Sequence, residues 1–339
     1  MLLADSVLEG NRLALARLLT QIENDTPQGR AVLGELFGRT GRAHLVGVTG
    51  APGTGKSSLV NQLARYYRHP PPGELARRVG IIAVDPSSPF TGGAILGDRV
   101  RMRDLAGDPD VFIRSMASRG SLGGLASATS GMVQALDAAG YEIILIETVG
   151  AGQAEVDIAR LAHTTVVVEA PGLGDEIQAI KAGILEIADI LVVNKADRPG
   201  VENTERALRN MLQLAHPIQR QTLHHGVPTV ALLPDATRTN QLVWQPPVLR
   251  SVATEGSGVS ELATEITRHR QFLEESGDWN RREQARLEAE LDALLQSTLV
   301  SRWRETTSAE IYQAVVDQLF GRQISPWQAV AILLDGVEP

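Results

Sequence analysis

The residues with the clearest chemical potential form a glycine-rich run that follows an apolar stretch and opens an amphipathic segment. The run reads Gly50-Ala51-Pro52-Gly53-Thr54-Gly55-Lys56-Ser57 and continues into Ser58. Backbone N–H groups of such a loop can surround an anion, and the next helix points its positive end at the same place. Lys56 can reach the outer phosphates, and the Ser57 hydroxyl can bind Mg²⁺. A chance glycine-rich turn would not match eight positions, so the run predicts a nucleoside triphosphate site.

A second motif selects the base. The apolar run Ile190-Leu191-Val192-Val193 leads into Asn194-Lys195-Ala196-Asp197, the NKxD pattern of guanine-nucleotide proteins. The Asp197 carboxylate can accept from both the N1–H and the exocyclic amine of guanine, whereas adenine would leave it desolvated and unpaired. A site built on such bonds can reject the wrong base by roughly 10⁴-fold. The motif therefore favours GTP and GDP over adenine nucleotides.

Two further segments follow apolar runs and carry carboxylates. Glu147-Thr148-Val149-Gly150 resembles the DxxG switch of GTPases with Glu in place of Asp, so Glu147 would approach Mg²⁺ and the Gly150 backbone would sense the γ-phosphate. The Gly- and Ser-rich segment from Asp85 to Arg99 is too long for a simple connection, which predicts a mobile switch. Asp85 and Asp98 are candidate Mg²⁺ ligands, although a capping or solvated carboxylate would explain each equally well.

Short β-branched runs that alternate with helical stretches must position these residues. After the run that ends at Val48, they are 79–84, 111–114, 143–146, 165–168, 190–193, 230–233 and 249–252. Such alternation predicts an α/β fold of the P-loop NTPase type, with a mostly parallel sheet between two helical layers. Open parallel sheets bind their ligands at the carboxyl ends of the strands. The motifs above follow strands, so we expect them to share that edge.

Helical periodicity flanks this region on both sides. Leu8 to Ile22 and Val32 to Phe37 predict a helical preface, and strand signals end near Gly258. We therefore expect three parts: an N-terminal helical extension at 1–42, a nucleotide domain at 43–258 and a C-terminal helical region at 259–339. Apolar positions at Leu287, Leu291, Leu294, Leu295 and Leu299 predict a long amphipathic helix over 278–303. Its apolar face fits either a dimer contact or packing within the chain.

Composition narrows the class of protein. The 339 residues are 43% hydrophobic, include no cysteine and carry a formal net charge of −8. Disulfides and thiolate metal sites are therefore excluded, and nucleic acid or an anionic membrane surface is disfavoured as a partner. No apolar run reaches membrane-spanning length, and the N-terminus has neither a basic region nor a cleavage pattern. We expect a cytoplasmic protein.

Taken together, these motifs resemble the MeaB/ArgK family of P-loop GTPases. The resemblance rests on the segments Asp85–Gly93, Gly97–Arg99, Ile113–Ser115, Arg119-Gly120, Glu147–Gly150, Gly152-Gln153 and Asn194–Asp197. It covers nearly the whole chain, and the long first switch is its most specific part. It implies a homodimeric GTPase that escorts an adenosylcobalamin-dependent acyl-CoA mutase of the methylmalonyl-CoA type, gates cofactor delivery and protects the mutase.

The resemblance also implies roles for particular residues. Lys56, Asp98 and Glu147 would take part in catalysis, and Ser57, Asp85, Asp98 and Glu147 would hold Mg²⁺. The segment Ala170–Glu176, which includes Asp175, matches the third switch of the family, which relays the nucleotide state to the partner. The fifth guanine loop matches less well because Val252 stands where such loops often carry Ser. The contact with guanine O6 would then come from the Ala253 backbone.

Two other functions compete with this interpretation. A kinase or ATPase of an amino-acid transport system is an older description of the same family, but a kinase needs a platform and a base for its acceptor hydroxyl, and we find no candidate residue outside the switches. A nickel-insertion GTPase would use Cys and His clusters, whereas this chain has no cysteine and His224-His225 fits a surface pair. The GTPase that escorts a mutase is the interpretation we favour.

Overall fold

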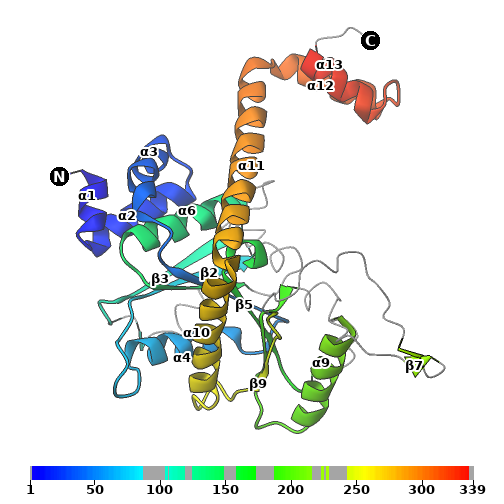
Figure 1. Ribbon diagram of the computed structural model, residues 1–339. Helices are drawn as coiled ribbons and strands as arrows, with labels where there is room; N and C mark the ends of the chain where they lie inside the picture. The colour runs from blue at the N-terminus through cyan, green and yellow to red at the C-terminus, as the bar shows by residue number, and fades with distance from the viewer. Residues whose placement is uncertain are drawn as a thin grey trace. The chain divides into compact units, whose positions relative to one another are not determined.

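Seven parallel strands form the central sheet, in the order β3-β2-β4-β1-β5-β6-β9 (Figure 1). The computed structural model describes residues 2–86, 104–105, 107–118, 124–148, 158–172, 187–215, 223–224, 227–228 and 243–335. The strands are β1 (His44–Thr49), β2 (Val79–Pro86), β3 (Val111–Ser118), β4 (Ile143–Thr148), β5 (Thr164–Glu169), β6 (Ile190–Val193) and β9 (Val248–Arg250). β7 (Leu223–His224) and β8 (Val227–Pro228) form a separate antiparallel pair. The predicted parallel sheet is confirmed.

Helices cover both faces of the sheet, as the sequence predicts. On one face lie α1 (Leu3–Leu8), α2 (Arg12–Glu23), α3 (Pro27–Leu36) with the short 3₁₀ helix η1 (Phe37–Arg39), and α6 (Gly124–Ala138). On the other face lie α4 (Lys56–Arg68) and α10 (Val259–Ser276), while α9 (Val201–Ala215) packs on β6 and β9. Strand β1 shows the alternation: Leu45 packs toward α2 and α6, and Val46 packs toward α4. This is the three-layer fold of P-loop NTPases.

The N-terminal helices are built from local signals and then fixed to the edge of the sheet. The Asn11 side chain accepts hydrogen bonds from Leu13 N and Ala14 N, which caps the start of α2. Leu15, Leu18, Leu19 and Ile22 of α2 are buried in the core that includes α6. The Arg114 guanidinium of β3 pairs with Glu23 at the end of α2. The predicted helical preface is therefore packed on the sheet domain.

The ends of the predicted strands differ in places. The run predicted at 230–233 lies outside the described residues. The last strand spans Val248–Arg250, whereas the sequence predicts 249–252. Its pairing ends early because Val252 turns away to form an isolated bridge with Ser257. None of the described helices combines the length and apolar composition that crossing a membrane requires.

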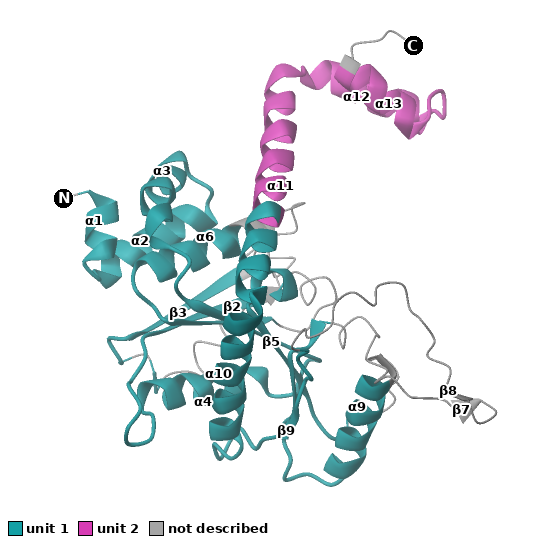
Figure 2. Ribbon diagram, viewed as in Figure 1, with its two compact units in different colours: residues 1–288 teal, residues 289–339 magenta. Residues whose placement is uncertain are grey.

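The described chain forms two compact units, residues 1–288 and residues 289–339 (Figure 2). The long helix α11 (Asp278–Thr306) contributes its first turns to the first unit and the rest to the second. The second unit also contains α12 (Ala309–Phe320) and α13 (Pro326–Asp335). Within it, Trp303 Nε1 donates to the Leu333 carbonyl at 2.9 Å, and Val315 and Ala329 are buried. The amphipathic helix predicted over 278–303 is confirmed as a helix.

Candidate nucleotide-binding site

The glycine-rich loop joins the end of β1 to the start of α4. Gly50 adopts φ +134°, and a Cβ there would lie 2.1 Å from the Val168 carbonyl oxygen. Gly55 adopts φ +94°, and a Cβ there would lie 2.4 Å from Asn194 Nδ2. Both positions require glycine, because a side chain would be strained and would collide with its neighbours. Helix α4 follows at once, so its first N–H groups and its positive end face the same loop.

Lys56 opens α4 and is only 5% exposed. Its ammonium donates to the Gly50 carbonyl at 2.7 Å and to the Ala51 carbonyl at 3.0 Å. The Thr54 hydroxyl donates to the same Ala51 carbonyl at 2.9 Å. These bonds hold a positive charge over the loop, where it can exchange backbone carbonyls for the oxygens of a bound phosphate.

Ser57 and Glu147 meet beside the loop. Glu147 lies near the end of β4 opposite Val48 of β1, so the pairing of the two strands brings the carboxylate next to α4. The Ser57 hydroxyl donates to Glu147 Oε1 at 2.6 Å, and both side chains are buried. A hydroxyl and a carboxylate oxygen at this separation are the ligand types that Mg²⁺ takes beside a triphosphate. The two residues therefore fit a metal site next to the bound phosphates.

The other predicted metal ligands belong to the β2 side of the sheet. β2 pairs with β4 through Val84 and Thr148, so the Asp85 backbone lies one residue beyond this pair. The side chain of Asp85 lies outside the described part of the chain, as do Asp98 and Gly150. The third-switch carboxylates, Asp175 and Glu176, also lie outside it. Of the predicted metal ligands, Ser57 and Glu147 are thus the pair that the described residues bring together.

The base motif is hydrogen-bonded to the phosphate loop. Asn194 follows β6 and is 2% exposed. Its Nδ2 donates to the Thr54 carbonyl at 2.8 Å, and its Oδ1 accepts from Ser251 Oγ at 3.1 Å and from Ala253 N at 3.0 Å. The Asn194 side chain thus joins the loop after β1 to the loop after β9. Sequence reasoning identified Ala253 but missed Ser251, which supplies a hydroxyl one residue before Val252.

Lys195 and Asp197 complete the motif. Lys195 has φ +57°, and its ammonium donates to the Gly53 carbonyl at 2.6 Å. Asp197 lies in the turn that follows and is exposed. The Asn194 and Lys195 side chains therefore hold the loop in place, while the Asp197 carboxylate stands at the surface where a base edge can approach it. The exposed Asp197 carboxylate is thus free to accept hydrogen bonds from N–H groups on the edge of a base.

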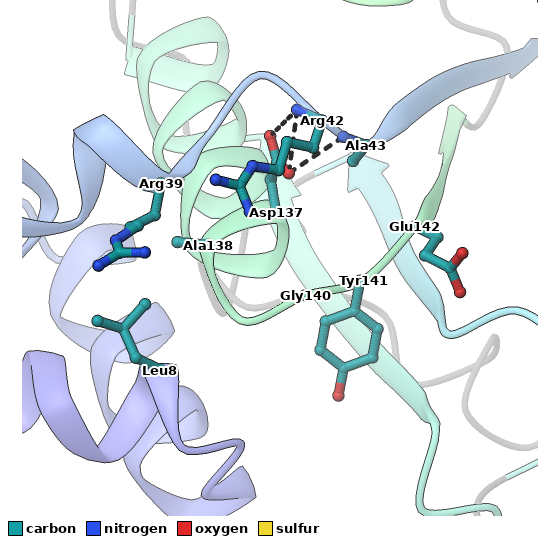
Figure 3. A pocket seen from close by; sticks show the side chains of 9 residues that line it. All are labelled: Leu8, Arg39, Arg42, Ala43, Asp137, Ala138, Gly140, Tyr141 and Glu142. Atoms are coloured by element: carbon teal, nitrogen blue, oxygen red, sulfur yellow. Dashed lines mark hydrogen bonds between the residues drawn. The ribbon is translucent and has the colours of Figure 1, made fainter.

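A cavity among the described residues lies away from this site. A hollow of about 390 Å³ is lined by Leu8, Arg39, Arg42, Ala43, Asp137, Ala138, Gly140, Tyr141 and Glu142 (Figure 3). These residues precede β1 and β4, so the cavity lies at the amino edge of the sheet, opposite the phosphate loop. Burial raises the pKa of Asp137, which accepts from the N–H groups of Gly41, Arg42 and Ala43. Asp137 thereby fixes the junction between the preface and β1.

Comparison with known proteins gives matches over nearly the whole chain. The family described as methylmalonyl-CoA mutase-associated GTPase MeaB matches residues 15–308. A protein of Pyrococcus horikoshii described as a GTPase is 41% identical over 335 residues, which cover 99% of this chain and 97% of the relative. The mitochondrial methylmalonic aciduria type A homolog of Caenorhabditis elegans is 33% identical over 293 residues, which cover 82% of this chain and 68% of the relative. The crystal structure of a LAO/AO transport system kinase aligns with a TM-score of 0.65 at 26% identity and covers 98% of this chain and 95% of that one.

Proposed function

The chain belongs to the MeaB family of GTPases. We propose that it is a cytoplasmic chaperone that uses GTP hydrolysis to assist an adenosylcobalamin-dependent acyl-CoA mutase. In this role it gates cofactor delivery and protects the mutase from inactivation. The observation that carries the proposal is the family match over residues 15–308, because the family is named for association with methylmalonyl-CoA mutase. The nematode relative, named for methylmalonic aciduria, agrees with it.

In the proposed site, the phosphate loop and the base motif divide the nucleotide between them. The backbone of residues 50–55 with Lys56, Ser57 and Ser58 holds the phosphates. Asp197 accepts from the guanine N1–H and amine, and the Ala253 backbone faces O6. Asn194 and Lys195 support this arrangement through their bonds to Thr54 and Gly53. The γ-phosphate is sensed by the backbone of Gly150.

We assign the Mg²⁺ ion to Ser57 and Glu147, with Asp85 and Asp98 as the further ligands. The buried pair at 2.6 Å supports this assignment, since hydroxyl and carboxylate oxygens suit a hard cation. The ion, when bound, neutralises charge that develops on the phosphates. By accepting the hydrogen bond from the Ser57 hydroxyl, Glu147 also fixes the orientation of that hydroxyl beside the proposed Mg²⁺ position.

Replacing Glu147 with glutamine is expected to lower GTP turnover at limiting Mg²⁺ by about 10- to 100-fold, with partial recovery as Mg²⁺ is raised. The amide keeps the size of the side chain but loses the charge that attracts the cation. Hydrolysis measured across a Mg²⁺ titration tests this. Glu142→Gln is the matched control, because Glu142 lies before β4 at the opposite edge of the sheet. Equal Mg²⁺ dependence in Glu147→Gln and wild type would remove Glu147 from the metal site.

The mutase is expected to accelerate a slow basal hydrolysis. GTPases often orient the attacking water with a Gln directly after the switch glycine, but Ala151 follows Gly150 here and the nearest Gln is Gln153. A partner that orders the switches or supplies an arginine can raise turnover by roughly 10³- to 10⁵-fold. Single-turnover hydrolysis with and without a methylmalonyl-CoA-type mutase tests this. We expect Asp175→Ala and Glu176→Ala to lose the stimulation and keep the basal rate. Equal rates with and without the mutase would contradict the escort function.

We further propose that the second unit forms a homodimer contact. Leu291, Leu295 and Leu299 follow one face of α11 and are 65%, 53% and 56% exposed. Phe320 at the end of α12 and Trp327 in α13 are 92% and 84% exposed. Large apolar side chains gathered in so small a unit are typical of a surface that another chain covers.

The double variant Leu295→Glu/Leu299→Glu is expected to be a monomer in light scattering, whereas the wild-type chain has twice that mass. Charges placed on an apolar contact lose their hydration when the contact forms, so they oppose association. Gln296→Glu adds a charge to an exposed position next to Leu295 and should leave the dimer intact. A double variant that still dimerises with unchanged affinity would place the interface elsewhere.

A further inference from the structure

Three buried histidines gather at the amino edge of the sheet, away from the nucleotide loops. His44 begins β1, His163 immediately precedes β5, and His269 lies in α10; their exposures are 1%, 2% and 0%. The rings of His44 and His163 stack with centroids 6.2 Å apart. We call His44, His163 and His269 the histidine cluster. Buried histidines on three separate elements need specific partners, because an unsatisfied buried ring nitrogen is costly.

The bonds of His163 require an uncharged ring. Its Nδ1 accepts a hydrogen bond from the Leu45 backbone N–H at 3.1 Å, so this nitrogen carries a lone pair. Its Nε2 lies 3.2 Å from Glu283 Oε2 of α11 and therefore donates to it. A second proton on the ring would direct an N–H at the Leu45 N–H, and that bond would break. The indole of Trp279 packs on the ring with centroids 3.9 Å apart and limits where it can move.

His44 and His269 are joined through one hydroxyl. Thr164 Oγ1 lies 2.7 Å from His44 Nε2 and 2.9 Å from His269 Nδ1. His269 Nε2 lies 3.3 Å from Asp189 Oδ1. In one arrangement, His44 donates to Thr164 and Thr164 donates to His269 Nδ1, so the Nε2 proton of His269 faces the Asp189 carboxylate. Each ring then carries a single proton.

The first turns of α11 are held to the sheet by polar bonds to this region. Arg282 makes two bonds of 2.8 Å to the Asp189 carboxylate and a third of 2.8 Å to the His163 carbonyl. Glu283 binds both His163 and Arg286, and Arg286 is the only buried residue of the described helix α11. Apolar contacts tolerate small shifts of a helix along its neighbour, whereas directional hydrogen bonds of this kind fix the position of α11 on the sheet. The part of this attachment made through Glu283 therefore depends on the protonation of His163.

We propose that the histidine cluster is an acid-released latch, which holds residues 279–286 of α11 on the amino edge of the sheet while His163 is neutral and releases them when His163 is protonated. The latch lies wholly within residues 1–288. It does not depend on the mutase function proposed above. Since α11 continues without a break to Thr306, release of its first turns frees the base of the helix that carries the exposed leucines.

The surroundings of His163 and His44, burial above all, favour their neutral rings near pH 7. Burial lowers the pKa of His163. Glu283 acts to raise this pKa, whereas the charges of Arg286 and Arg282 lower it further. Burial also lowers the pKa of His44 far below its ordinary value, with His163, Arg270 and His269 adding to the effect and Asp189 opposing it. A lowered folded-state pKa means that the unfolded or released ring takes up the proton first. The stability of the latch is therefore full above the ordinary histidine pKa of about 6.5 and falls as the pH drops below it.

The carboxylates of the latch stay ionised through this range. Burial acts to raise the pKa of Asp189, but hydrogen bonds from His269 and Arg282 outweigh it and lower that pKa to about 2. Burial likewise acts to raise the pKa of Glu283, and bonds from His163 and Arg286 lower it to about 2. His163 is thus the group of the latch whose charge changes under mild acid, whereas Asp189 and Glu283 respond only in strong acid.

Hydrogen exchange on the full chain tests the latch. Between about pH 7.5 and about pH 5, after correction for the intrinsic exchange rate, we expect amides of 278–288 to lose at least about tenfold in protection. Amides of α4 should keep theirs. His163→Gln cannot titrate and should show the same protection of 278–288 at both pH values, while His69→Gln, at an exposed histidine, should behave as wild type. Unchanged protection in the wild type, equal loss in α4, or the wild-type pH dependence in His163→Gln would each overturn the proposal.

A measurement on the wild-type chain needs no variant that might fail to fold. Nitrogen-15 spectra of the imidazole rings distinguish the two neutral forms and the charged form. We expect His163 to carry its proton on Nε2 at about pH 7.5 and to become doubly protonated only below about pH 6.5. A His163 ring that is charged at about pH 7.5, or protonated on Nδ1, would overturn the latch.

Discussion

Lys56→Ala is expected to lower the rate of GTP hydrolysis by about 10²- to 10³-fold and to leave the protein folded. The ammonium lies over the phosphate loop, where it contacts the Gly50 and Ala51 carbonyls, and it can stabilise charge on the transferred phosphoryl group. Loss of this charge affects the transition state more than the core, because the bonds of Lys56 are made to loop carbonyls rather than to apolar side chains. Single-turnover hydrolysis with saturating nucleotide measures the effect.

The control for this change is Arg65→Ala, which removes a positive side chain from an exposed position of the same helix. It should hydrolyse GTP at the wild-type rate. Thermal unfolding of both variants reports whether the fold is retained. A folded Lys56→Ala protein with wild-type turnover would mean that the glycine-rich loop does not hold the reacting phosphate.

Much of the fold could be predicted because its signals are local. Apolar β-branched runs that alternate with helical periodicity gave the parallel three-layer sheet, and the glycine-rich run before Lys56 gave the phosphate loop. The family match confirmed the GTPase interpretation. Gly50 illustrates why such motifs are readable: its positive φ and the nearby Val168 carbonyl leave no room for another residue.

The contacts between strands could not be predicted from local signals. Glu147 lies beside Ser57 only because β4 is the neighbour of β1, and strand order depends on the packing of the whole sheet. Ser251 was missed for the same reason, since its hydroxyl gains a role only when β9 pairs with β6 and brings it to Asn194. In the sequence, the position at which such loops often carry Ser is occupied by Val252.

The histidine cluster shows the same limit more strongly. His44, His163 and His269 are separated from one another by more than a hundred residues along the chain, and none of them belongs to a recognisable motif. The adjacent pair His224-His225 is the histidine feature that stands out in the sequence. Three parallel strands begin at one edge of the sheet, which brings the histidines together with Asp189 and the first turns of α11. Such a cluster arises from the fold as a whole, so the local spacing of residues in the sequence does not predict it.

Asp197→Asn is expected to change the base preference of the site from guanine to xanthine. The affinity for GTP should fall by up to roughly 10⁴-fold, and xanthosine triphosphate should bind in its place. The carboxylate accepts from the guanine N1–H and amine, whereas the amide can donate to the oxygen that replaces this amine in xanthine. The pocket should survive the change, because Asn194 and Lys195 hold the phosphate loop through their own bonds and Asp197 is exposed.

Nucleotide titration of Asp197→Asn tests this prediction. The control is Asp292→Asn, which changes an exposed aspartate of α11 outside the nucleotide unit. If Asp197→Asn kept the wild-type preference for GTP over xanthosine triphosphate, the base would be read by other residues. Because the substitution exchanges one hydrogen-bond pattern for another, gain of the xanthine nucleotide distinguishes altered recognition from a damaged fold, which could only lose binding.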